Sequence, residues 1–130
     1  MGGVLRALLA DAPVLTDGAW GTQMQARGLE PGTCPDAWNL SHPERVEEVA
    51  QAYVEAGSRV IITNTFGGTR FALNRYGLAD RAGEINRLGA EISRRAAGAR
   101  AKVFGSIGRT PSCLRAGSPG PSAASRPRLR

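Results

Sequence analysis

The sequence predicts an α/β fold in which short parallel strands alternate with helices, and three apolar runs carry this prediction. The runs are residues 13–16, 60–63 and 102–104. Each contains apolar residues at consecutive positions, a pattern typical of strands covered on both faces in a parallel sheet. Successive runs lie about 45 residues apart, which leaves room for a crossover helix. The order therefore indicates βαβ units with right-handed crossovers.

The first run, residues 13–16, ends at Asp17 and Gly18, where the chain would turn away from a strand. A short helix is expected near residues 21–27, and the segment 30–35, which contains Pro and Gly, is expected to be a loop. This arrangement places a carboxylate at the carboxyl end of the first strand. Ligand sites of α/β proteins are found at such strand ends.

The next helix is expected to begin at Ser41, because Ser41 and Glu44 have the S-x-x-E spacing of a capping box. Pro43 lies inside the first turn, where proline is tolerated. Gly57 lies where a left-handed C-terminal cap is wanted. The apolar residues of this helix recur at helical spacing and form one stripe: Val46, Val49, Ala50, Tyr53 and Val54.

The second run, residues 60–63, is followed by the polar and glycine-containing segment 64–68. A longer helix is expected over residues 79–97, and the third run, 102–104, follows it and leads into residues 105–108. The apolar face of the longer helix is expected to comprise Ile85, Leu88, Ile92 and Ala96.

Two architectures fit these units: a doubly wound sheet or the start of a (β/α)8 barrel. A dinucleotide-binding fold would carry G-x-G-x-x-G in its first βα turn. Residues 17–22 are D-G-A-W-G-T and do not match that pattern. Composition and spacing alone predict an α/β protein with a site at the carboxyl ends of its strands.

The formal charge of +6 and the pI near 10.6 come from the end of the chain. Residues 109–130 hold five arginines and no acid, whereas residues 1–108 hold twelve Lys and Arg against eleven Asp and Glu. The basic segment lacks aromatic residues and apolar periodicity, so it is expected to be a disordered tail and no nucleic-acid partner is expected. The abrupt loss of pattern at Arg109 is also consistent with a frameshift in the coding sequence.

Cysteine usage and hydropathy indicate a cytoplasmic protein. Cys34 and Cys113 lie far apart without C-x-x-C spacing, which favours two free thiols in a reducing compartment. The apolar run near the N-terminus is short and is interrupted by Arg6, so it is a poor signal peptide. No stretch approaches the roughly 20 apolar residues that span a bilayer, and no membrane partner is expected.

Five local sequences, taken together and in order over residues 14–108, resemble the homocysteine S-methyltransferase family. The resemblance is to the homocysteine-binding domain and is closest in kind to its methionine-synthase-like branch. The segments are D-G-A-W-G-T at 17–22, W-N-L-S-H-P at 38–43, Y-V-E-A-G-S-R-V-I-I-T-N-T-F at 53–66, Y-G-L at 76–78 with E-I-N at 84–86, and G-S-I-G at 105–108.

The resemblance implies a (β/α)8 barrel, of which residues 1–108 would be the first third, and methyl transfer to the thiol of homocysteine to give methionine. It implies that Asp17 and Gly18 bind the polar end of the amino acid, since a carboxylate can pair with an ammonium group. Thr63 and Phe66 are implied as further pocket residues: a hydroxyl and N–H for the substrate carboxylate, and an apolar wall. Residues 64–65 are expected to hold that loop.

The same resemblance implies a zinc cofactor, which the family holds with three cysteines from later strands and which ionises the substrate thiol. Cys34 and Cys113 match none of those ligands, so we assign no metal ligand and no catalytic residue to this chain. The expectation is an N-terminal fragment that binds homocysteine and is inactive alone. The alternative is a non-catalytic amino-acid-binding or barrel-completing fragment, and the methyl donor stays open.

Overall fold

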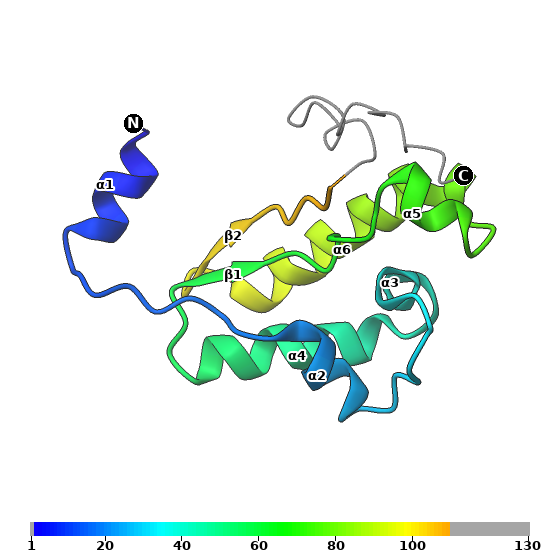
Figure 1. The fold of residues 1–130 in the computed structure, drawn as a ribbon. Coiled ribbons are helices and arrows are strands. Elements are labelled where there is room, and N and C mark those ends of the chain that lie inside the picture. Colours follow the sequence, from blue (N-terminus) through cyan, green and yellow to red (C-terminus); the bar gives the residue numbers. More distant parts are fainter. Residues whose placement is uncertain (1, 110–130) are drawn as a thin grey trace, which may run out of the picture.

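The computed structural model describes residues 2–109, in which the long helices pack against a small parallel sheet and the N-terminal helix stands apart from it (Figure 1). The expected disordered tail lies outside the described residues except for Arg109, and Cys113 lies outside them as well. The elements in chain order are α1 (Gly3–Leu9), α2 (Trp20–Gln25), the 3-10 helix η1 (Pro35–Ala37), α3 (Trp38–Ser41), α4 (Pro43–Glu55), β1 (Val60–Ile62), α5 (Arg70–Asn74), the 3-10 helix η2 (Ala79–Arg81), α6 (Ala82–Ala97) and β2 (Lys102–Phe104).

The strands β1 and β2 pair in parallel, with Val60 opposite Lys102 and Ile62 opposite Phe104. This confirms the parallel order predicted for the second and third apolar runs. The α4 and α6 helices pack against each other and against the sheet, as the crossovers of βαβ units do (Figure 1).

The strand predicted at residues 13–16 is wrong as a full strand, because only a single parallel bridge joins Thr16 to Val60. Leu15 accepts hydrogen bonds from the backbone of residues 59 and 60, so the pairing begins as predicted. It then ends at Asp17, whose side chain accepts the N–H of Ile62 at 2.7 Å. A carboxylate thus takes the donor that a backbone carbonyl would take in a longer ladder.

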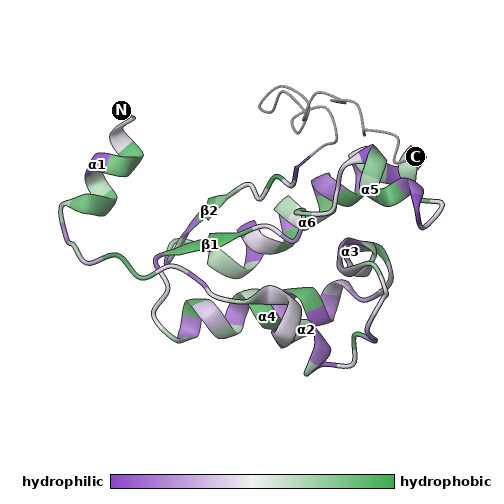
Figure 2. Cartoon of the chain, in the orientation of Figure 1, coloured by the Kyte–Doolittle hydropathy of each residue, from purple (hydrophilic) through white to green (hydrophobic). Residues whose placement is uncertain are grey.

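The core lies between the sheet and the two long helices. The stripe predicted for the helix after Ser41 is confirmed: four of its members are buried and Tyr53 is half-buried against them. In Figure 2, β1 is hydrophobic throughout, whereas α4 and α6 alternate hydrophobic and hydrophilic residues along their length. The buried members of this core are Trp20, Met24, Leu29, Trp38, Val46, Val49, Ala50, Val54, Ile61, Ile92, Ala97 and Ala101.

The capping box predicted at Ser41 is wrong. Ser41 is the last residue of α3, and its hydroxyl donates to the carbonyl of Ala37 at 3.3 Å. The α4 helix begins at Pro43 with His42 as its N-cap, without a side-chain cap. The local spacing does not indicate the extra helical turn of α3. This turn moves the start of α4 from Ser41 to Pro43. The C-terminal end is confirmed, since Gly57 has a φ of 103°.

The buried face of α6 is rotated slightly from the predicted one. Ile85 and Ile92 are buried as expected, whereas Leu88 and Ala96 are half-buried. The face also includes Gly89, Ser93 and two alanines. Ser93 donates to the carbonyl of Ile62 at 3.1 Å, so a polar residue faces the sheet with its hydrogen bond satisfied.

Gly89 allows α6 to approach the chain after β1. A Cβ at this position would lie 2.7 Å from Asn39 Nδ2, 2.7 Å from Thr65 Cγ2 and 3.2 Å from the carbonyl oxygen of Asn64. Alanine is the better helix former by about 1 kcal/mol. Here we expect Gly89→Ala to destabilise the fold by about 1–3 kcal/mol, because buried groups on both sides must move.

Gly83 in the same helix is the matched control, since a Cβ there meets nothing within 4 Å. Gly83→Ala is expected to stabilise the protein by about 0.5–1 kcal/mol. Urea unfolding followed by circular dichroism measures both variants. Opposite signs support the packing account, and two stabilising substitutions would contradict it.

Three short α-helices are additional to those predicted: α3, described above, and α1 and α5. The α1 helix exposes Val4, Leu5 and Leu9 in part, and α5 is capped by Thr69, whose hydroxyl accepts the N–H of Ala72 at 3.2 Å. Within residues 2–109, no helix has the length and apolarity that crossing a membrane requires.

Candidate functional site

The residues predicted to form a site meet at the carboxyl ends of the paired segments. Asp17 follows the Thr16 bridge, Thr63 follows β1, and residues 105–108 follow β2. Hydrogen bonds join these segments directly: Asp17 Oδ2 accepts from Ile62 N, and Thr63 Oγ1 accepts the N–H of Ser106 at 3.0 Å. The structure therefore brings these three ends together as one edge.

Asp17 is half-buried at this edge, and one of its carboxylate oxygens is fully engaged. Oδ2 accepts from the indole Nε1 of Trp20 and from the N–H of Ile62, both at 2.7 Å. Within residues 2–109 no hydrogen bond reaches Oδ1. The two donors fix the orientation of the carboxylate and leave the second oxygen available for a ligand cation.

Gly18 presents bare backbone next to this carboxylate. On one side it lies against Tyr53, whose hydroxyl oxygen would be 3.2 Å from a Cβ at residue 18. The same hydroxyl donates to the carbonyl of Ala19 at 3.0 Å, which fixes the turn after Asp17. The residue itself is exposed, so a ligand can approach its backbone closely.

Thr63 is buried and its donors are already used. Its N–H donates to the carbonyl of Phe104 at 3.1 Å. Its hydroxyl lies 2.6 Å from that of Thr65, and the Thr65 hydroxyl donates to the carbonyl of Ser106 at 2.7 Å, so Thr63 is the donor of the pair. A substrate carboxylate could take the Thr63 hydroxyl only by displacing Thr65. In this arrangement Thr63 joins the loops that follow β1 and β2.

Phe66 is 66% exposed, so its ring is available as an apolar surface at the same edge. Its backbone is held closely, because a Cβ added at Gly108 would overlap the carbonyl oxygen of Phe66. Glycine at 108 is thus required for the loops after β1 and β2 to touch.

Sequence reasoning misses Asn39, which anchors the loop formed by residues 63–68, hereafter the 63–68 loop. Asn39 is 1% exposed and its Nδ2 donates to the carbonyls of Asn64 at 2.8 Å and Ile85 at 3.0 Å. Asn64 donates in return to Asn39 Oδ1 at 2.9 Å and to the carbonyl of Pro35 at 2.9 Å. The only available signal was the N in the W-N-L-S-H-P segment.

The far end of the loop is held by Asn86, whose Nδ2 donates to the carbonyls of Gly68 and Ala82, each at 2.8 Å. A Cβ at Gly68 would overlap the Asn86 side chain. The role expected for residues 64–65 in holding the loop therefore extends to two further asparagines from α3 and α6.

Asp36 is a second buried residue that the sequence does not single out. It is 4% exposed, and its Oδ1 has no hydrogen-bond partner. Burial raises the pKa of this carboxyl from 3.8 to about 6, although the N–H groups of Asp36 and Gly67 oppose the change. A Cβ at Gly67 would lie 2.7 Å from Oδ2, so the carboxylate lies directly against the 63–68 loop.

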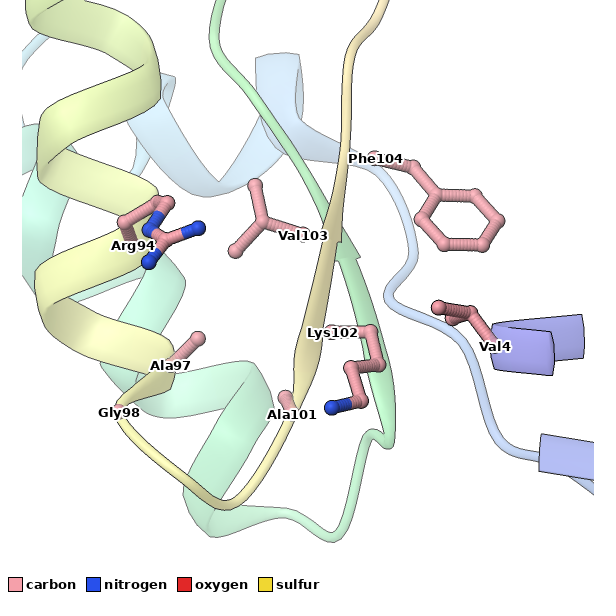
Figure 3. Close-up of a pocket in the computed structure, with 8 residues that line it drawn as sticks. All are labelled: Val4, Arg94, Ala97, Gly98, Ala101, Lys102, Val103 and Phe104. Carbon is pink, nitrogen blue, oxygen red and sulfur yellow. The ribbon is translucent and has the colours of Figure 1, made fainter. Parts of the chain in front are cut away.

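A separate cavity of about 260 Å³ follows the edge of β2 that has no strand neighbour in the described sheet. Figure 3 shows Arg94 and Val103 on the α6 side of β2, and Phe104 and Val4 on its other side. Two cations flank it, but Arg94 and Lys102 are both exposed and lie on different sides of the strand. The cavity marks an open strand edge.

The fold is that of an α/β protein, and the candidate site lies at the carboxyl ends of its parallel strands. The family model for homocysteine S-methyltransferase matches residues 14–129, and the chain belongs to that family. The matched range continues beyond residue 108, where the expected resemblance ended.

Methionine synthases are among the curated relatives. The protein of Mycobacterium tuberculosis (strain ATCC 25618 / H37Rv) is 37% identical over 98 residues, which are 69% of this chain and 8% of that protein. The protein of Mycobacterium leprae (strain TN) is 36% identical over 97 residues, which are 68% of this chain and 8% of that protein. The chain therefore spans about a twelfth of the length of these relatives.

Solved structures of the homocysteine methyltransferase MmuM from Escherichia coli have the same fold over most of this chain. The oxidized form matches with a TM-score of 0.73 and 28% identity, covering 82% of this chain and 41% of MmuM. The metallated form matches with the same TM-score and identity, covering 93% of this chain and 47% of MmuM. The chain thus spans less than half of these structures.

Proposed function

We propose that this chain forms the substrate-binding part of a homocysteine S-methyltransferase, built on the first strands of a (β/α)8 barrel. The observation that carries the proposal is a single edge, where Asp17 is hydrogen-bonded to Ile62 at the end of β1 and the 63–68 loop is hydrogen-bonded to Ser106. Membership of the family and the likeness to MmuM support homocysteine as the ligand.

In this proposal Asp17 Oδ1 accepts a charge-assisted hydrogen bond from the substrate ammonium. The exposed backbone of Gly18 lies beside it, and the Phe66 ring offers an apolar wall to the side chain of the amino acid. Thr63 contributes by holding the loops after β1 and β2 in register, since its own donors are used. These roles bind and orient the substrate.

The zinc implied by the family does not fit the residues that the structure describes. Within residues 2–109, no three His, Cys, Asp or Glu side chains lie close enough to hold a metal ion. Cys34 is buried beside Leu73 and Ile85, and burial raises the pKa of its thiol, which opposes the thiolate that zinc requires. We therefore derive no step through a metal and name no methyl donor.

The barrel arrangement is supported by apolar side chains that remain exposed on the described sheet. Leu15 is 62% exposed and Phe104 is 39% exposed, although both lie within the paired segments. A mainly apolar groove also lies between α1 and the face of the sheet that carries Val60 and Ile62. A closed barrel has no free edges and fills its interior with such side chains.

Asp17→Asn tests the proposal, because asparagine keeps an oxygen for Trp20 and Ile62 while removing the charge. Loss of a charge-assisted hydrogen bond is expected to weaken L-homocysteine binding by about 10- to 100-fold. Calorimetry on the full chain measures the affinity. Asp11→Asn is the control, since Asp11 is exposed and lies at the other end of the sheet beside Arg59.

Equal affinities for the parent and Asp17→Asn would contradict the proposed ammonium site. Absence of any homocysteine binding by the parent chain would contradict the proposed function as a whole. Methyl transfer by the full chain, measured with a supplied methyl donor, would contradict the expectation that this chain is inactive alone.

A further inference from the structure

We propose that Asp36 is a positioning residue for the 63–68 loop, and that ionisation of its carboxyl sets how firmly the loop is held for substrate. The inference rests on the proposed function, since the 63–68 loop carries Thr63 and Phe66. It assigns a role to a residue that lies outside the edge where the substrate would bind.

The geometry places the carboxylate directly against the loop. Asp36 lies in η1, and its Oδ2 would be 2.7 Å from a Cβ at Gly67. Gly67 does not have a positive φ, so its backbone conformation does not require glycine. The space that a side chain at 67 would need is instead occupied by the Asp36 carboxylate.

The same carboxylate is expensive to bury. Its Oδ1 has no partner, and a buried polar atom without a hydrogen bond costs free energy. An asparagine or an apolar residue would fill the position at lower cost. The Gly67 N–H favours the ionised form, because it opposes the rise in the pKa of Asp36, and a charged acceptor attracts an N–H more strongly than a neutral one.

The surroundings of Asp36 contain few groups that could obscure its titration. The neighbouring ionisable group on its own segment is the Cys34 thiol, whose pKa is raised by burial. From α6, which packs against η1, the nearest charged side chains along the helix are Glu84 and Arg87, both exposed, and Glu84 is paired with Arg81 at 2.9 Å. The α3 helix and the 63–68 loop contain no ionisable side chain.

These facts predict a pH response within the loop. The pKa of Asp36 is about 6. The carboxyl is therefore ionised and holds Gly67 above that pH, and it is neutral and holds Gly67 less firmly below that pH. In the free amino acid the carboxyl group titrates well below this range, and the amino and thiol groups titrate above it. Affinity for the amino acid is therefore expected to fall as the pH drops from 7 to 5.

The first experiment follows the backbone amide of Gly67 by NMR between pH 4.5 and 7.5, using the full chain without ligand. We expect one titration step near pH 6 in the parent, lost in Asp36→Asn and retained in Asp80→Asn, where the mutated side chain is 99% exposed. A Gly67 amide that does not titrate, or that still titrates in Asp36→Asn, overturns the proposal.

The second experiment measures L-homocysteine affinity at pH 5 and pH 7 by calorimetry. We expect the parent to lose about fivefold or more in affinity at pH 5, and Asp36→Asn to show no such loss. A pH step that persists in Asp36→Asn overturns the role in substrate positioning. If homocysteine is not bound at either pH, the proposed function fails, while the Gly67 titration still decides whether Asp36 controls the loop.

Discussion

Asn39→Ala is expected to lower the free energy of unfolding by about 3 kcal/mol or more, among the largest effects of a single substitution in this chain. Asn39 donates to two buried carbonyls, those of Asn64 and Ile85, and accepts from the Asn64 side chain. Alanine leaves these groups without partners in a site that water does not reach, and it opens a cavity between α3 and α6. Urea unfolding followed by circular dichroism measures the change.

Asn74→Ala is the matched control, because Asn74 is exposed at the end of α5. It is expected to change stability by no more than about 0.5 kcal/mol. A loss in Asn39→Ala as small as that in the control would show that the Asn39–Asn64 pair does not hold the 63–68 loop. Homocysteine binding by any folded Asn39→Ala protein should weaken as well, because the loop carries Phe66.

The parallel sheet could be predicted because its signal is local. Consecutive apolar residues at 60–62 and 103–104 are typical of a parallel sheet, and β1 and β2 have the predicted order, although Lys102 and Phe104 are exposed. The run at 13–16 carries the same local signal but forms only a bridge, since the Asp17 side chain takes the next backbone donor. That outcome depends on a contact between residues 45 apart, which no window of sequence contains.

The α1 and α5 helices escaped prediction for a different reason. The seven residues of α1 and the five of α5 are too short for a 3.6-residue period to emerge. The start of α4 was misplaced by a related effect. The S-x-x-E spacing is real, but the preceding turn is itself helical and Ser41 belongs to it. Local motifs predict a helix more reliably than its first residue.

The meeting of the strand ends around Asp17 and Thr63 could be predicted, and the hydrogen bonds within that edge could not. Parallel strands bring their carboxyl ends to one edge, so Asp17 and the 63–68 loop were expected together, and Asp17 is hydrogen-bonded to Ile62, the residue directly before that loop. The hydroxyl of Thr63, expected to face substrate, is used by Thr65 and a loop 43 residues away. Asp36 is likewise buried only by tertiary packing, so the sequence around it does not predict its burial.

Asp36→Asn is expected to stabilise the protein at neutral pH and to have almost no effect at pH 4. The carboxyl titrates at 3.8 when unperturbed and at about 6 in the fold, so the folded state holds the proton more tightly. Stability contributed by Asp36 is therefore full below pH 3.8 and is lost as the pH rises to about 6. The difference corresponds to about 3 kcal/mol at pH 7.5, which asparagine would avoid.

Thermal and urea unfolding of both proteins at pH 4 and pH 7.5 measure this difference, with Asp80→Asn as the exposed control. All other carboxyls are shared by parent and variant, so their titration cancels in the comparison. An equal stability change at both pH values would show that Asp36 is not buried as a costly charge. A gain at pH 7.5 that accompanies loss of the Gly67 titration would mean that the chain gives up stability to keep a proton-responsive contact beneath its substrate loop.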